Sequence, residues 1–222
     1  MQKQKSKKIL TYFFLFLSIC TLNNKNFINK NFAEVNKIVI NGLDEKNIYE
    51  IKKHINYLDL DNLFFLDKIK IRKIIQSNNL VENFTVFKIY PSTLDIRINK
   101  TDFLVKTKRK DKYFILGSNG KFIESKDDKN IPLIFGDFEE GNFFKLKEAI
   151  DHSNFDFKNI KNLFSFKSGR WDIETKDGLK IMLPKNNIKE SLELFLFFQK
   201  ENEKNNFKKF DLRQHNQVIT NG

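Results

Sequence analysis

The side chains that could do chemistry are few, and they lie far apart in the sequence. The three histidines, His54, His152 and His215, show no spacing typical of a metal site. The single cysteine, Cys20, excludes both a disulfide within the chain and a thiolate metal site. There is no Gly-x-Ser-x-Gly motif and no phosphate-binding loop, and most carboxylates stand beside lysines, as on a solvated surface. The sequence therefore predicts a protein without catalytic activity, cofactor, metal or small-molecule substrate.

The overall composition predicts a folded protein rather than a disordered one. A length of 222 residues is enough for one medium domain or two small ones. Hydrophobic residues make up 40% of the chain, which is enough for a packed core. The net charge is +12, from 40 basic and 28 acidic residues. A nucleic-acid partner is not favoured, because the basic residues are spread over the whole chain and no binding motif accompanies them.

The N-terminal segment predicts the topology. Residues 1–8 carry four lysines and no acid, and residues 9–22 are strongly apolar. This order predicts export with the N-terminus kept inside. At ~1.5 Å per residue the apolar segment spans about 21 Å, short of a bilayer core of roughly 30 Å, so a cleaved signal peptide is an alternative. Bulky Ile19 makes a poor cleavage site. We expect a cytoplasmic tail, a single transmembrane anchor over residues 9–22, a polar tether over 23–34, and the remainder outside the cytoplasmic membrane.

A first external domain is predicted over residues 35–101, in the order strand, helix, helix, strand, strand. Apolar residues recur at helical spacing after Asp44 and Asp67, two residues that favour helix N-termini. The predicted elements are a strand over 35–40, a helix with Ile48, Ile51 and Ile55 inward, a helix to about Gln76 with Ile71, Ile74 and Ile75 inward, and a hairpin of residues 84–89 and 94–98.

This order of elements resembles a POTRA domain of the type found in the FtsQ/DivIB family of cell division proteins. Residues 63–67, with the sequence LFFLD, match the family's leucine-phenylalanine-aspartate segment. Residues 90–94, with the sequence YPSTL, match its aromatic-proline-x-threonine-leucine turn. Residues 79–80 and 99–102 depart from the family pattern.

A second domain is predicted over residues 102–222 and carries further motifs of the same family. Trp171 begins an alternating segment that turns at Asp177 and Gly178 and runs to Pro184, which predicts a hairpin with Trp171 in the core rather than on a ligand surface. Asn187 and Glu190 predict a capping pair for a helix running to about Lys204. The hairpin resembles an FtsQ-type motif, as do residues 131–136 and the closing Asp-Leu-Arg at 211–213. The predicted fold class is α+β: a transmembrane helix, a POTRA domain and a mixed β domain with flanking helices.

The resemblance implies a non-enzymatic connector of the divisome at the septum, with FtsB-like and FtsL-like proteins and other division proteins as partners. It also implies that the last strand is an exposed edge to which a partner strand can add. In this sequence that edge is expected over residues 211–218, with the partner-binding residues Asp211, Leu212, Arg213, Gln214, His215, Asn216, Gln217 and Val218. The alternative assignment of Asp211 and Leu212 is structural, with the aspartate capping a turn and the leucine packing in the core.

Two other classes of binding protein stay open at this point. A POTRA-containing accessory protein for secretion or outer-membrane assembly is the first, although no barrel fits into residues 102–222. A structural protein that binds the cell wall without protein partners is the second.

Overall fold

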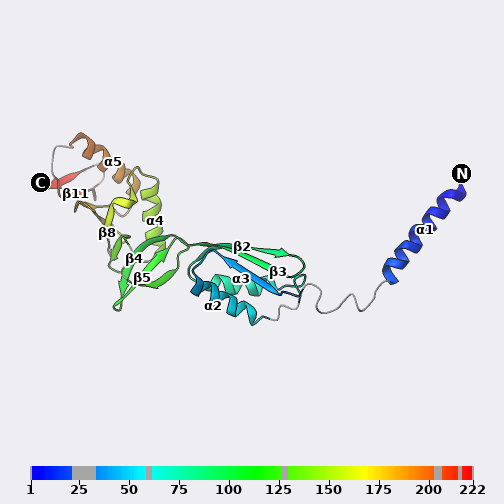
Figure 1. Cartoon of the computed structure of the whole chain (residues 1–222). Helices are drawn as coiled ribbons and strands as arrows, with labels where there is room; N and C mark the ends of the chain where they lie inside the picture. Colours follow the sequence, from blue (N-terminus) through cyan, green and yellow to red (C-terminus); the bar gives the residue numbers. More distant parts are fainter. Residues whose placement is uncertain are drawn as a thin grey trace. The chain divides into compact units, whose positions relative to one another are not determined.

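The computed structural model describes residues 2–21, 34–58, 62–126, 130–202, 207–214 and 217–221. The chain divides between Lys100 and Thr101 into two compact units (Figure 1). Each unit has its own hydrophobic core, and the residues of both cores lie at or after Val35. A chain that starts at residue 34 therefore keeps both cores whole.

The N-terminal helix, α1 (Gln2–Thr21), is exposed on all of its described sides. Among the described residues no helix is long and apolar enough to cross a membrane. The transmembrane helix predicted over residues 9–22 is thus not supported by the structure. The physical reason is the lysine-rich start of α1, which leaves too short an apolar stretch.

The first unit forms a mixed α+β domain with two helices on one face of a three-stranded sheet (Figure 1). The central strand pairs in parallel with the first strand and antiparallel with the second, giving the order β1-β3-β2. The predicted order of strands and helices is confirmed. The elements are β1 (Lys37–Asn41), α2 (Glu45–Asn56), α3 (Lys68–Ser77), β2 (Val81–Ile89) and β3 (Thr93–Lys100).

Local chemistry explains where these helices begin. Asp44 accepts a hydrogen bond from the Asn47 backbone N–H, and Asp67 accepts from Ile69 and Lys70, as predicted for N-caps. Gly42 has φ 108°, and a Cβ there would lie 1.7 Å from the Ile98 carbonyl oxygen, so only glycine fits this turn. Of the predicted inward positions, Ile48 and Ile74 are only partly buried, and the buried ones are Ile51, Ile55, Ile71, Ile75, Leu94, Ile96 and Ile98.

The second unit is a nine-stranded sheet in the order β12-β11-β10-β9-β8-β7-β4-β5-β6. The predicted hairpin at Asp177 and Gly178 is confirmed by the antiparallel pairing of β9 with β10. Its elements are β4 (Phe103–Arg109), β5 (Lys112–Gly117), β6 (Phe122–Ser125), β7 (Leu133–Phe135), α4 (Glu140–Asp151), η1 (Phe157–Asn159), β8 (Ile160–Ser165), β9 (Trp171–Thr175), β10 (Lys180–Met182), α5 (Ile188–Glu201), β11 (Lys209–Asp211) and β12 (Ile219–Asn221).

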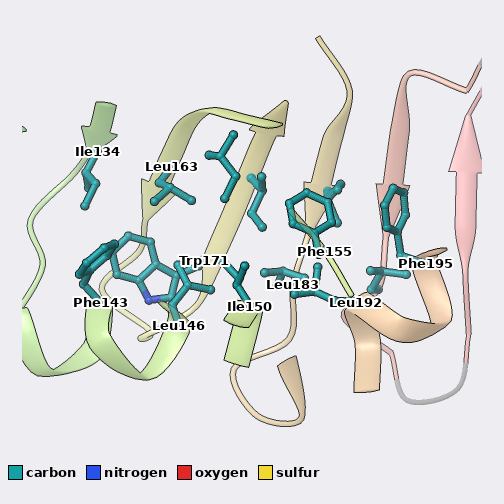
Figure 2. Close-up of a cluster of buried hydrophobic side chains, with 14 of the residues drawn as sticks. Ile134, Phe143, Leu146, Ile150, Phe155, Leu163, Trp171, Leu183, Leu192 and Phe195 are labelled. Carbon is teal, nitrogen blue, oxygen red and sulfur yellow. The ribbon is translucent and has the colours of Figure 1, made fainter. Parts of the chain in front are cut away.

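Helices α4 and α5 cover one face of this sheet and leave the other open. Figure 2 shows Phe143, Leu146 and Ile150 of α4 meeting Trp171 and neighbouring strand residues. Trp171 is 2% exposed and makes an edge contact with Phe143, so its prediction as a core residue is confirmed.

Helix α5 departs from its prediction at both ends. Asn187 has φ 59° and its side chain makes no capping hydrogen bond, so the predicted capping pair with Glu190 is wrong. Asn187 adopts a left-handed conformation in place of the extended one usual for an N-cap, and its carbonyl accepts from the Ser191 N–H and hydroxyl. The helix ends at Glu201 rather than Lys204, and residues 203–206 lie outside the described part of the chain.

Candidate partner-binding edge

The nine-stranded sheet ends at β12, a three-residue strand. β12 pairs antiparallel with β11, with Lys209 opposite Asn221 and Asp211 opposite Ile219. No strand in the described part of the chain pairs with its other side. An unpaired strand edge presents backbone donors and acceptors to any extended segment that reaches it.

The direction of the backbone groups on β12 follows from the pairing of β11. Lys180 N–H donates to the Lys208 carbonyl at 3.0 Å, and Leu212 N–H donates to the Met182 carbonyl at 2.9 Å, so even-numbered residues of β11 turn toward β10. Odd-numbered residues of β11 then turn toward β12, opposite Ile219 and Asn221. By the same alternation the N–H and C=O of Thr220 point to the open side.

Residues Asp211 and Arg213 form a fixed charged pair beside this edge. The Arg213 Nε donates to Asp211 Oδ1 at 2.8 Å, and the Arg213 backbone N–H donates to the same oxygen at 3.1 Å. The guanidinium hydrogen bond is the main reason why the pKa of Asp211 is lowered. The pKa of Arg213 is raised by the same contact. Arg213 keeps 42% of its side chain exposed, so it can present a positive charge to a partner.

A second carboxylate lies on the open face of the sheet. Asp172 of β9 and Asp211 of β11 both stand opposite Met182 of β10, and so share one row. Burial raises the pKa of Asp172, against the opposing effects of Arg170 and Arg213. Arg170 Nε lies 3.5 Å from Asp172 Oδ1. Both atoms are buried, and within the described residues neither has a hydrogen-bond partner. The row therefore holds polar groups whose hydrogen-bonding capacity is not used by the fold.

A hollow of about 300 Å³ lies between the start of α5 and the residues that follow β11. Glu190 and Leu194 of α5 form one wall, and Leu212 and Arg213 form another. Its volume lies at the small end of the range for ligand pockets, which is roughly 300–1,000 Å³.

The predicted partner-binding residues do not form one edge strand, which corrects the sequence-based prediction. Asp211 ends β11, and Gln214 follows it without regular structure. The chain then turns back, with the Gln217 N–H donating to the Gln214 carbonyl at 3.4 Å. The edge strand is Ile219–Asn221 instead. The correction has a physical reason: Leu212 is 2% exposed and its N–H is already bonded to β10, so this segment is held inside the sheet.

The remaining predicted positions differ in what the structure says of them. Val218 leads into β12 and packs partly against the core. Gln217 is exposed. His215 and Asn216 lie outside the described residues. Partner binding by any of these residues stays a prediction.

Sequence reasoning missed Thr220, Arg170 and Asp172 as members of this surface. Arg170, Trp171 and Asp172 had a signal, because they stand in the hairpin that resembles the FtsQ motif. Thr220 had none, since three ordinary residues near a C-terminus do not reveal a strand. In the described residues no group of histidine, cysteine, aspartate and glutamate side chains could hold a metal ion. His152 uses Nδ1 for a 2.8 Å contact with the Glu148 carbonyl of its own helix.

Comparison with known proteins identifies the family. The fold of residues 37–100 defines a POTRA domain, and the family model for the POTRA domain of FtsQ type matches residues 33–100. The model for the C-terminal part of cell division protein FtsQ/DivIB matches residues 104–213. Together these matches take in well over half of the chain. The chain belongs to the FtsQ/DivIB family of cell division proteins.

Individual relatives agree with this assignment. Cell division protein FtsQ of Rickettsia bellii is 24% identical over 188 residues, which is 82% of this chain and 70% of that protein. Cell division protein FtsQ of Bradyrhizobium diazoefficiens is 24% identical over 173 residues, covering 75% of this chain and 50% of that protein. The chain thus spans 50% and 70% of the two relatives.

One solved structure is also similar. It is the major extracytoplasmic domain of the trans isomer of the cell division protein DivIB from Geobacillus stearothermophilus. The TM-score is 0.36 at 10% identity, over 48% of this chain and 98% of that chain. A TM-score below 0.5 adds nothing to the family assignment.

Proposed function

We propose that this protein is a non-enzymatic connector of the divisome, which holds other division proteins at the septum by binding them. The family assignment supports the setting, cell division. The observation that carries the binding mechanism is the open edge of β12, with the backbone of Thr220 turned outward. An extended partner segment adds there as a tenth strand, and the partners are FtsB-like and FtsL-like proteins, as the family resemblance implies.

Backbone and side chains have different tasks in this mechanism. The Thr220 N–H and C=O supply the first hydrogen bonds of the added strand, which are independent of the partner's sequence. Selection comes from neighbours of the edge: Ile219, which is 49% exposed, offers apolar contact, and Arg213 favours an acidic residue. The hollow beside α5 accepts a side chain that flanks the added strand.

A proline at Thr220 tests this mechanism. Proline removes the outward N–H and keeps the groups that pair β12 with β11. The full-length protein is used as bait in detergent extracts of membranes. We expect Thr220→Pro to lose the FtsB-like and FtsL-like proteins while its thermal unfolding stays near that of the wild type.

Two matched variants make the result specific. Thr220→Val keeps the backbone N–H and should retain the partners. Ile219→Pro removes an N–H that faces β11, so it should lose both strand order and partners. Retention of the partners by a folded Thr220→Pro protein would exclude the β12 edge as the docking site.

The proposed location is the outer side of the cytoplasmic membrane at the septum, with residues 35–222 exported and α1 associated with the membrane. The lysines before the apolar residues of α1 support this orientation. An export-dependent phosphatase fused after Gly222 should be active. Activity of a cytoplasmic reporter at the same position would reverse the assignment. A secretion or outer-membrane assembly accessory role finds no support, because the second domain matches the FtsQ/DivIB model.

A further inference from the structure

Large apolar side chains are exposed together at one end of the POTRA domain. Phe65 is 89% exposed, which is extreme for a phenylalanine, and its neighbour Phe64 is 50% exposed. Leu63 and Leu66, on either side of them, are buried. The two largest side chains of this segment are therefore exposed between two buried leucines. The full set, called here the linker-side patch, is Tyr57, Phe64, Phe65, Ile69, Ile89 and Tyr90.

Contacts between elements place these residues at a single end. Phe64 stacks on Tyr90 with ring centroids 4.7 Å apart, and Lys88 Nζ donates to the Phe64 carbonyl at 3.2 Å. These contacts join the segment before α3 to the turn between β2 and β3. Ile69 lies in the first turn of α3. Tyr57 caps α2, which runs back from the far end of β1.

The chain also enters the domain at this end. The backbone N–H groups of Asn36 and Lys37 both donate to the Ser92 carbonyl, at 3.0 and 3.2 Å, and Lys37 stands opposite Thr93. The start of β1 therefore lies beside the Tyr90 turn. The residues between α1 and β1 attach next to the linker-side patch.

Two observations identify what covers the patch. First, residues 9–17 of α1 expose large apolar side chains, with Phe14 65% and Tyr12 71% exposed, and such a segment is stabilised at a lipid surface. About 15 residues connect α1 to β1, a reach of at most about 50 Å, so both apolar regions can meet the same surface. Second, tyrosine is enriched at bilayer interfaces, and large apolar side chains flanked by lysines are typical of segments that lie at a lipid surface. Lys37, Lys68 and Lys88 supply the lysines here.

We propose that the linker-side patch docks the POTRA domain onto the lipid surface of the membrane. Phe65 and Ile69 insert at the level of the headgroups, Tyr57 and Tyr90 lie at the interface, and the lysines extend to the lipid phosphates. Docking at this end points β2 and β3 along the membrane normal. It takes membrane association of α1 as its setting, but it is tested without α1, so the two can fail separately.

Vesicle flotation with a chain of residues 34–222 tests the proposal, because this chain keeps both cores and lacks α1. The vesicles contain phosphatidylethanolamine and phosphatidylglycerol. We expect the wild-type chain to float with the vesicles. The double variant Phe65→Ser, Ile69→Ser should bind at least about tenfold less, because each substitution removes an apolar side chain that inserts into the membrane. Both side chains are mostly exposed in the free protein, so thermal unfolding should not change.

A matched control lies in the other domain. Phe197 of α5 is 65% exposed, similar to Ile69 at 68%, and is outside the patch. Phe197→Ser should float like the wild type. No flotation of the wild-type chain, or equal flotation of the double variant, would overturn the proposal. So would self-association of the chain that the double variant abolishes while flotation is unchanged, because a second copy would then cover the patch.

Discussion

The POTRA domain and the C-terminal domain share one layout but differ in how well the charged groups on their open sheet faces are hydrogen-bonded. In each, helices cover one face of a sheet, and the open face carries a buried aspartate with an arginine two residues away. In the POTRA domain Arg97 Nε donates to Asp95 Oδ2 at 3.0 Å. In the C-terminal domain Arg170 Nε stands 3.5 Å from Asp172 Oδ1 without forming a hydrogen bond. Within the described residues, the buried atoms left without a hydrogen bond are one in the POTRA domain, Asp95 Oδ1, and two in the C-terminal domain, Arg170 Nε and Asp172 Oδ1.

The two domains also end in different edges. In β2 the odd-numbered residues form the backbone hydrogen bonds to β3. The N–H and C=O groups of the even-numbered residues Phe84, Val86 and Lys88 therefore point outward. β12 offers only Thr220 within three residues. Length of edge alone would therefore favour the POTRA domain as the docking site. The β2 edge also has a charged pair nearby and a hollow of about 510 Å³. Our proposal places partner binding at the shorter edge because the family resemblance implies the last strand of the second domain.

The largest expected effect separates the stability of the two domains. Ile96 is 0% exposed in the POTRA core, and Ile96→Asp buries a charge there, which should cost several kcal/mol and unfold that domain. Trp171 is the only tryptophan and lies in the C-terminal core, so its fluorescence reports the second domain alone. We expect the Trp171 transition to stay unchanged while far-UV circular dichroism loses the POTRA signal.

The control for this variant is Ile89→Asp, because Ile89 is 50% exposed and should tolerate the charge. A shift of the Trp171 transition in Ile96→Asp would show that the two domains unfold together. An unaltered circular dichroism signal would show that Ile96 does not face the core.

The next effect compares the two charged pairs. Arg213→Glu places a negative charge beside Asp211 and opposite an acidic partner residue, where like charges can cost several kcal/mol of binding free energy. Arg97→Glu does the same beside Asp95 in the POTRA domain. We expect co-purification of FtsB-like proteins to fail for Arg213→Glu and to persist for Arg97→Glu. The reverse result would move the docking surface to the POTRA sheet.

A proline in each edge compares the edges directly. Val86→Pro removes an outward N–H from β2, as Thr220→Pro does from β12, and neither group serves the pairing within its sheet. We expect a small change in thermal stability for both, and loss of the partners for Thr220→Pro alone. Equal loss in both variants, measured by the same membrane pull-down, would mean that partners engage two edges.

The smallest effect concerns pH. Burial raises the pKa of Asp172 in the folded state above its value of 3.8 in the unfolded chain, so its ionisation lowers stability as the pH rises above 3.8. The pKa of Asp211 is lowered, so its contribution is present above 3.8 and is lost as the pH falls through the folded value. Asp172→Asn should stabilise the C-terminal domain at pH 7 and have little effect below pH 3.8.

Asp211→Asn should act in the opposite direction, destabilising the domain at pH 7. Urea unfolding followed by Trp171 fluorescence at several pH values measures both effects. An Asp172→Asn variant less stable than the wild type at pH 7 would mean that its attraction to Arg170 outweighs burial.

Sequence alone determined the order of the POTRA elements and most of both cores. Asp44 and Asp67 predicted the helix starts, and the alternation of Leu94, Ile96 and Ile98 predicted the inner face of β3. These signals are local, because caps and periodicity depend on neighbours within a few residues. The prediction of a capping hydrogen bond at Asn187 failed because residue type alone does not set the backbone conformation. Asparagine can cap a helix, but its left-handed backbone here does not give the capping hydrogen bond.

Only the tertiary structure decided where the sheet ends and which groups face outward. Leu212 and Val218 are both apolar and near the C-terminus, yet pairing with β10 holds Leu212 inside the sheet, while Val218 leads to the edge strand. The outward turn of Thr220 depends on the register of β12 against β11, and the burial of Asp172 depends on the strands that pair on either side of β9. Register and burial arise from contacts between segments distant in the sequence, so no local pattern can specify them.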